Sequence, residues 1–88
     1  MIRWDPEKDR WLRINRGISF GGLSDMILAK RYLDIEEHPT RANQLVFVLR
    51  VHDYAHAVPF VFGSDDTIFL KTAYPSRKLH RRYGRRSQ

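Results

Sequence analysis

The last fifth of the chain carries a dense run of basic residues whose chemistry suits phosphate. The stretch FLKTAYPSRKLHRRYGRR, residues 69–86, contains seven Lys and Arg residues and no Asp or Glu. A lysine offers a compact positive charge, and an arginine guanidinium donates paired hydrogen bonds to phosphate oxygens. These residue types indicate a polyanionic partner, and a solvated tail or an arm that docks a partner protein are the alternatives.

The spacing of these residues predicts shared faces on a helix over residues 76–83. Arg77, His80 and Arg81 fall at i, i+3 and i+4 and therefore lie on one face. A neighbouring face carries Lys78 and Arg82. Leu79 and Tyr83 are four apart and are expected to pack this helix onto a sheet. The alternative role of Tyr83 is to direct its hydroxyl at the site.

A lysine precedes this helix on the last expected strand. Alternation places Lys71 on the face opposite Ile68 and Leu70. If the helix folds back beside the strand end, Lys71 and Arg77 converge on one small anion. Such a cleft would preorganise charge, which a flexible tail cannot do.

Charge is distributed unevenly along the chain. The net charge is +6, and residues 71–88 carry +7, so the other 70 residues hold nine basic and ten acidic groups. Apolar residues make up 42% of the chain, which excludes wholesale disorder. The absence of cysteine excludes disulfides and thiolate metal sites. No apolar run approaches the roughly 20 residues of a membrane span and no signal peptide is recognisable, so we expect a cytoplasmic protein without membrane contact.

Apolar periodicity predicts a single domain over residues 1–83 with a basic tail at 84–88. Asp5, Pro6 and Gly17 mark the ends of a first helix, and Ser19 caps a second that reaches about Lys30. Trp4 and Trp11 are expected in the core. The expected strands cover residues 32–38, 44–51, 54–62 and 67–74, and Pro59 within the third of them indicates an edge strand or a bulge. The pattern predicts an α+β fold: a small antiparallel sheet of three to four strands, two N-terminal helices and a basic C-terminal helix.

Other catalytic arrangements find little support. His52 and His56 flank an expected hairpin turn, where their spacing does not suit a metal pair, and both are expected near the surface. The acidic residues of the strand at 32–38 are expected to be solvated, and no nucleophile elbow or nucleotide-binding glycine loop is present. If the chain is an enzyme, the remaining chemistry is cleavage of RNA by its own 2′-hydroxyl, which needs mainly positive charge at the phosphate and a proton donor.

Five segments resemble, in order, the BrnT family of type II toxin–antitoxin toxins. They are IRWDPEK, RGISF, DIEEHP, HDYAHAVPFVF and IFLKTAYPSRK, and the similarity runs over residues 2–83. The resemblance implies a RelE-like fold and a metal-independent mRNA endoribonuclease that inhibits translation, with no cofactor. It also implies a cognate antitoxin, an RNA substrate that is free or on the ribosome, and contact with operator DNA only through the antitoxin.

The resemblance also assigns residues. Arg77 and Lys78 match the Arg-Lys of the family's Ser-Ala-Arg-Lys motif, and Lys71 matches a branch that carries FLKT. Three residues resemble the basic-then-tyrosine end of the family helix: Arg81, Arg82 and Tyr83. Departures occur at Gly21 and Gly22, where the family has acidic residues. Others occur at His52 and Asp53, where Asn-Gly is expected, and at His80.

The sequence therefore predicts two sets of site residues. The catalytic set neutralises the scissile phosphate and includes Tyr83 or His80 for proton transfer: Lys71, Arg77, Arg81, Tyr83 and His80. The RNA-binding set is Arg50, Lys78, Arg82, Arg85 and Arg86. The alternative prediction is a module that binds nucleic acid or an antitoxin without catalysis.

Overall fold

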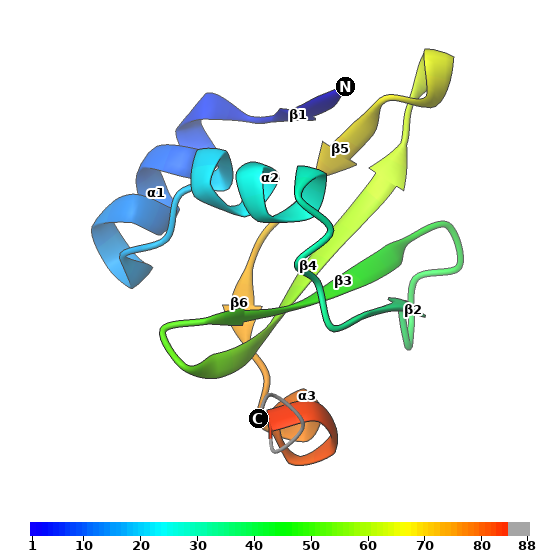
Figure 1. Cartoon of the computed structure of the whole chain (residues 1–88). Helices are drawn as coiled ribbons and strands as arrows, with labels where there is room; N and C mark the ends of the chain where they lie inside the picture. The colour runs from blue at the N-terminus through cyan, green and yellow to red at the C-terminus, as the bar shows by residue number, and fades with distance from the viewer. Residues whose placement is uncertain (85–88) are drawn as a thin grey trace.

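The structure, a computed structural model, describes residues 1–84 of the chain (Figure 1). In chain order its elements are β1 (Ile2–Trp4), α1 (Pro6–Arg16), α2 (Phe20–Leu28), β2 (Asp34–Glu37), β3 (Leu45–Val51), β4 (Tyr54–Phe62), the short turn η1 (Ser64–Asp66), β5 (Ile68–Leu70), β6 (Tyr74–Pro75) and α3 (Arg77–Tyr83). Across the described residues, no helix has the length and apolar character that crossing a membrane requires.

The strands form one mixed sheet of six strands in the order β1-β5-β4-β3-β2, with β6 also paired to β4. The central pair, β3 and β4, is antiparallel, whereas β1 runs parallel to β5 in the register Ile2↔Ile68. The predicted α+β class is confirmed, but the predicted antiparallel sheet of three to four strands is wrong. The difference arises because β1 is only three residues long and is a strand by virtue of pairing with a segment more than 60 residues away.

Helices cover both faces of this sheet (Figure 1). Alternate residues of β3 and β4 point to opposite sides. On one side, Phe47, Leu49, Val58 and Phe60 pack beneath α1 and α2. On the other side, four smaller residues pack beneath α3: Val46, Val48, Ala55 and Ala57. The nearly continuous apolar sequence of the central strands follows from this two-sided burial.

Capping residues set the helix boundaries, as the sequence predicts. The Asp5 carboxylate accepts from the Glu7 N–H at 3.0 Å, and Ser19 and Ser76 accept from the N–H groups of Gly22 and Leu79. Each bond satisfies a backbone donor that the first helical turn leaves free. Helix α1 ends at a glycine with φ of 64°, Gly17, as expected for a left-handed C-terminal cap.

The turn between β3 and β4 is formed by two residues in the left-handed region. His52 and Asp53 have φ values of 52° and 65°, and Val51 pairs with Tyr54 across them. Two positive φ values are typical of the tight hairpin turn that matches strand twist. The predicted two-residue break is thus confirmed, although the sequence lacks the usual Asn-Gly.

Pro59 interrupts the pairing of β4 with the strands on the side away from β3. It lies within this central strand, buried and paired in register with Val46, and not at an edge. On its other side the pairs Ala57↔Tyr74 and Phe60↔Leu70 enclose two residues of β4 and three of the facing segment, so the bulge that was the other predicted setting is present there. Because proline has no N–H, the ladder is interrupted on the side of β4 that faces β5 and β6, whereas β3 continues past Pro59 on the other side to the pair Leu45↔Phe60. The expected strand at 67–74 is accordingly split: β5 stops at Leu70, β6 starts at Tyr74, and only the Lys71 N–H reaches the Pro59 carbonyl, at 2.8 Å.

Two aromatic side chains lie elsewhere than predicted. Trp11 is 44% exposed on α1 and lies beside the cations of Lys8 and Arg16 instead of in the core. His56 is buried, whereas a surface position was expected; burial lowers its pKa, and its ring nitrogen bonds the Tyr54 carbonyl at 2.9 Å. Both positions depend on which face of an element is covered, which spacing alone did not resolve.

Candidate nucleic-acid interface

Helix α3 is anchored to the sheet by its two apolar residues and by one hydroxyl. Leu79 and Tyr83 are buried against the smaller face of β3 and β4. The Tyr83 hydroxyl donates to the Asp34 carboxylate at 2.6 Å and also contacts that of Glu36, both on β2. Hydrogen bonds to these two carboxylates and burial raise the pKa of Tyr83 to about 12. Tyr83 therefore serves to hold the helix, and its hydroxyl is a poor proton donor or base near neutral pH.

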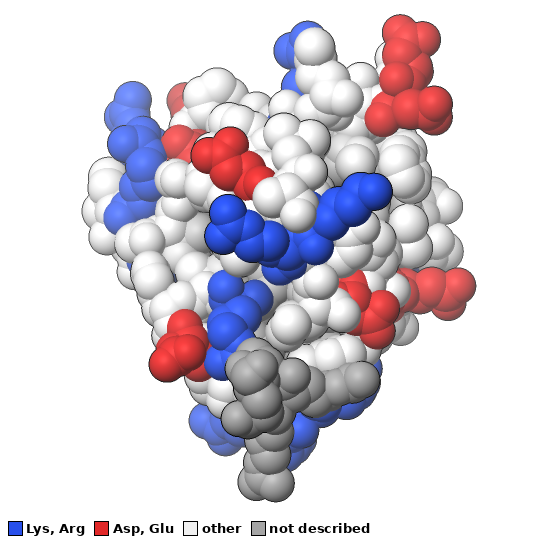
Figure 2. All heavy atoms as spheres, viewed as in Figure 1, with Lys and Arg blue, Asp and Glu red and all other residues white. Residues whose placement is uncertain are grey.

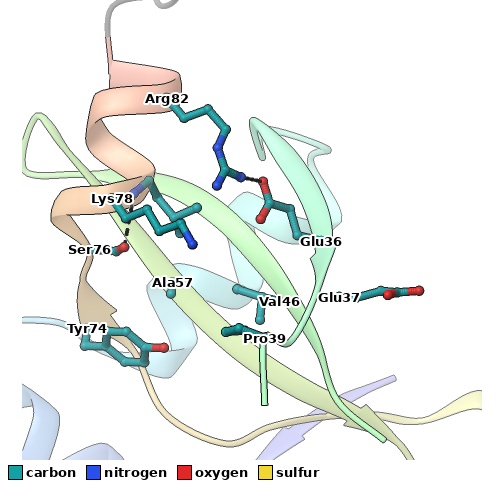
Figure 3. A pocket seen from close by; sticks show the side chains of 10 residues that line it. Glu36, Glu37, Pro39, Val46, Ala57, Tyr74, Ser76, Lys78 and Arg82 are labelled. Atoms are coloured by element: carbon teal, nitrogen blue, oxygen red, sulfur yellow. Dashed lines mark hydrogen bonds and ion pairs between the residues drawn. The ribbon is translucent and has the colours of Figure 1, made fainter. Parts of the chain in front are cut away.

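The expected solvated acidic strand is instead part of this attachment. Figure 3 shows the guanidinium of Arg82 directed at the Glu36 carboxylate, with which it forms an ion pair, while Glu37 points away from the helix. Burial alone would raise the pKa of Glu36, but hydrogen bonds from Tyr83 and Arg82 outweigh it and lower the net value. Arg82, predicted to bind RNA, is thus committed to a carboxylate within the protein.

The remaining polar residues of α3 divide between its outer face and its other flank. Since Leu79 and Tyr83 point at the sheet, Arg77 and Arg81 point away from it on a helix of 3.6 residues per turn. Both arginines are exposed. His80 lies on the flank, where its ring stacks on Tyr54 at a centroid distance of 4.0 Å. The predicted common face of Arg77, His80 and Arg81 therefore separates into two solvent-facing cations and one packed ring.

His80 has one ring nitrogen already engaged. Its Nδ1 accepts a hydrogen bond from the Ala55 N–H at 3.2 Å, so in this geometry the ring carries its proton on Nε2. The ring also lies so close to Gly84 that a Cβ there would meet it at 2.7 Å. Gly84 is needed for this close approach, and His80 acts chiefly as a packed side chain.

Arg50 is a structural residue at the end of α3. Its guanidinium contacts the carbonyl of Gly84 and, more weakly, the carbonyl and carboxylate of Asp53 at 3.4 and 3.5 Å. A cation at the C-terminal end of a helix stabilises it because the last carbonyls lack helical partners. The predicted RNA contact from Arg50 would require breaking this cap.

Two adjoining clefts lie on the side of the sheet that α3 covers. The first is narrow, about 110 Å³, and its floor is apolar. Figure 3 shows Lys78 extending over this cleft from α3, with Val46 and Ala57 below and Tyr74 at one end. Lys78 is exposed and therefore available to a ligand.

The second cleft shares Tyr74 with the first and is larger, about 400 Å³. It lies between the loop that follows β2 and the interrupted segment 71–73. Eight residues line it: His38, Thr40, Arg41, Gln44, Pro59, Lys71, Thr72 and Tyr74. The lining contains two permanent cations, a histidine and three hydroxyl groups, and none of the eight is acidic. Lys71 lines this cleft, and its Nζ lies 5.3 Å from the ring centroid of Phe69, which is outside the lining; this attraction is worth about 0.5–1 kcal/mol at an exposed site.

The sequence did not identify the loop that forms one wall of this cleft. The backbone of His38 bonds that of Gln44 at 3.1 Å, and Gln44 bonds Arg41 at 3.2 Å, which closes the loop on itself. The His38 Nδ1 accepts from the N–H groups of Thr40 and Arg41, both at 3.1 Å. The only signal in the sequence was a histidine followed by polar residues between two strands, which is common in ordinary loops.

The structure does not bring every predicted residue to one place. Lys71 lines the larger cleft, Lys78 and Arg82 line the smaller, and Arg77 and Arg81 belong to neither. Arg85 and Arg86 lie outside the described residues. Figure 2 shows Lys and Arg on both sides of the end of the molecule where α3 lies, and basic and acidic groups interspersed over the rest of this face. Within residues 1–84, no three His, Asp or Glu side chains gather as potential metal ligands.

Comparison with known proteins adds no relative. The chain matches no family model, no curated protein and no solved structure. The site must therefore be interpreted from its own geometry.

Proposed function

We propose that this chain is the toxin of a type II toxin–antitoxin system, a metal-independent mRNA endoribonuclease that inhibits translation in the cytoplasm. The observation that carries this proposal is the rigid attachment of an acid-free basic segment to the sheet: the Tyr83 hydroxyl and the Arg82–Glu36 ion pair hold α3 in place. A fixed array of cations can stabilise a transition state, which a mobile tail cannot.

In the proposed reaction, a water molecule takes the proton of a ribose 2′-hydroxyl, and the 2′-oxygen attacks the adjacent phosphorus. The bond from phosphorus to the 5′-oxygen breaks, and that oxygen takes a proton from water, so that no net proton is gained or lost. The products are a 2′,3′-cyclic phosphate and a 5′-hydroxyl. Arg77 and Arg81, the two exposed cations of α3, neutralise the negative charge that accumulates on the oxygens of the scissile phosphate, and preorganised charge of this kind is often the largest catalytic contribution. Lys71, which lines the larger cleft, holds another phosphate of the same strand. His80 has only its Nε2–H left to offer, since its Nδ1 accepts from Ala55.

The family, the antitoxin and the operator DNA contact belong to this proposal through the sequence resemblance. A RelE-like fold is likewise supported by that resemblance alone, because the parallel pairing of β1 with β5 departs from the antiparallel sheet it implies. The antitoxin would be a protein that covers the basic face, and the RNA substrate would be bound free or on the ribosome.

A non-catalytic binding module is the second candidate. The outward direction of Arg77 and Arg81 favours it, since cations on an open helix face can track a polyanion without enclosing a reacting group. Such a module would bind nucleic acid or an acidic antitoxin segment and cut nothing.

The test is induced expression in a bacterial host with growth and total RNA followed in parallel. Wild-type protein is expected to arrest growth with loss of mRNA. Arg77→Ala should lose cleavage by about 100-fold, the effect of removing one transition-state donor, with a smaller change in RNA affinity. Arg10→Ala, which removes an exposed cation on α1, is the matched control and should retain the effect. Normal growth and intact RNA from folded wild-type protein would leave the binding module as the function.

A further inference from the structure

We infer that the cleft between the loop at residues 38–44 and the segment at 71–74 is a binding site for a phosphodiester group of single-stranded RNA. None of its wall residues except Lys71 was identified from the sequence. The inference rests on the proposed function for the source of the phosphodiester, but the site itself is argued from its chemistry and rigidity.

The chemistry of the lining selects an anion with several oxygen acceptors. Arg41 and Lys71 supply two permanent positive charges from opposite walls, and Thr40 and Thr72 add hydroxyl donors. No carboxylate competes with a ligand among the eight lining residues. Two acidic residues of β2, Glu36 and Glu37, line the adjoining cleft, where Glu36 is paired with Arg82. The volume of about 400 Å³ lies within the roughly 300–1,000 Å³ of small-ligand sites and holds one phosphate with part of its nucleotide.

His38 gives the site a directed donor. Its Nδ1 accepts from two backbone N–H groups, those of Thr40 and Arg41, so the neutral ring must carry its proton on Nε2. These hydrogen bonds to Nδ1 fix the orientation of the ring, as a hydrogen bond to the second ring nitrogen of a functional histidine usually does. The Nε2–H is then free to donate to an oxygen in the cleft.

The opposite wall is equally fixed. The Lys71 N–H bonds the Pro59 carbonyl at 2.8 Å, and the Ala73 carbonyl accepts from Arg16 of α1. Between these two points Thr72 forms no ladder pair with β4, and pairing resumes only at Tyr74. The segment at 71–73 therefore leaves the ladder beside Pro59, and backbone hydrogen bonds hold both walls of the cleft before any ligand arrives.

The adjoining position of α3 makes the site continuous with the basic helix. Tyr74 lines both clefts, and Lys78 extends over the smaller one (Figure 3). In an RNA strand with one phosphate beside Lys71, the next nucleotide would lie along the Tyr74 ring, on which its base can stack, and the strand would continue toward Lys78. The site therefore takes an internal phosphodiester of a single strand rather than free phosphate alone.

The test measures binding separately from cleavage. The probe is a single-stranded oligonucleotide with 2′-deoxyribose throughout, which presents phosphodiesters but has no 2′-hydroxyl, and inorganic phosphate is titrated in parallel. The full chain is compared with Arg41→Gln, Lys71→Gln and His38→Asn. The Asn carboxamide oxygen can still accept from the Thr40 and Arg41 N–H groups, so His38→Asn keeps the loop while it removes the ring donor. Arg10→Ala removes an equal charge elsewhere.

Fluorescence anisotropy should show that Arg41→Gln and Lys71→Gln each weaken oligonucleotide binding by about ten-fold or more, and that each lowers the salt slope by about 0.7. His38→Asn should weaken binding without changing that slope, since it removes a donor and no permanent charge. Phosphate should move the amide NMR signals of residues 38–41 and 71–73 in wild type. Affinities that match Arg10→Ala in all three cleft variants, together with phosphate-induced signals that move only elsewhere, would overturn the site. Movement with phosphate but equal oligonucleotide affinity in all variants would show a site for free phosphate and overturn the RNA assignment.

Cleavage of an RNA of the same sequence separates this inference from the proposed function. If wild type binds the deoxy oligonucleotide in the cleft but leaves RNA intact, the binding site stands and the ribonuclease fails. If all three cleft variants cleave RNA at the wild-type rate, the ribonuclease stands and the cleft is overturned.

Discussion

Removal of a single hydroxyl should loosen the attachment of α3. Tyr83→Phe keeps the buried ring against Leu79 but deletes the donor to Asp34 and Glu36. A hydrogen bond to a charged group contributes about 1.5–3 kcal/mol. The hydroxyl has one proton to share between two acceptors, and the exposed Asp34 regains water, while Glu36 retains Arg82. We therefore expect a loss at the lower end of that range, about 2 kcal/mol.

Urea unfolding followed by circular dichroism measures this loss. A chain of this size has an m-value of about 1–1.5 kcal/mol/M, so the midpoint should fall by about 1.5 M. Tyr32→Phe is the matched control, because the Tyr32 ring packs against the Phe47 ring with 5.3 Å between the ring centroids. The free energy of unfolding of this variant should differ from that of wild type by less than about 0.5 kcal/mol.

The effect should also be confined to a window of pH. The folded protein lowers the pKa of Glu36 below its usual 4.5, so its contribution is present above 4.5 and is lost as pH falls through the folded value. The pKa of Tyr83 is raised from 10.0 to about 12, so its contribution is present below pH 10 and is lost as pH rises toward 12. The difference between wild type and Tyr83→Phe should be greatest between these limits and shrink on both sides. Equal midpoints for the two proteins at pH 7 would refute the attachment described for α3.

Three further changes test other parts of the structure. Arg50→Ala should lower the free energy of unfolding by about 1–3 kcal/mol, because it removes the cation that contacts the carbonyl of Gly84 directly after α3; an unchanged urea midpoint would contradict this role. His52→Asn with Asp53→Gly should raise stability by up to about 1 kcal/mol, since both positions have positive φ; a lower melting temperature would show that the native side chains matter more than the turn. Gly84→Ala should displace the His80 ring, with which a Cβ would collide, and shift the NMR signals of Tyr54.

Local sequence patterns determined the helices and the central hairpin. Asp5, Ser19 and Ser76 cap helices because each cap is decided within three residues of the chain. The break at His52 and Asp53 was evident because apolar strands flank it directly. The concentration of positive charge after residue 70 is likewise a property of the sequence alone.

The partners of these charges were decided only by tertiary structure. Arg82 and Arg50, both predicted to contact RNA, instead bind Glu36 and the carbonyl of Gly84, which are 46 and 34 residues away. Nothing local distinguishes a cation that pairs within the protein from one that faces solvent, because the choice depends on which strand lies beneath the helix.

The cleft has the same origin. Pro59 was visible in the sequence, but its effect falls on the neighbouring strand. There it separates β5 from β6 and leaves the segment that carries Lys71 outside the ladder. The loop that carries His38 and Arg41 precedes β3, and the pairing of β3 with β4 over seven residues places the end of this loop beside Pro59. The loop and the segment at 71–73 therefore line one cleft. The sequence thus determined that the chain has the charge to bind phosphate, and the pairing of strands decided where a phosphate can be held, because only long-range hydrogen bonding fixes two walls against each other.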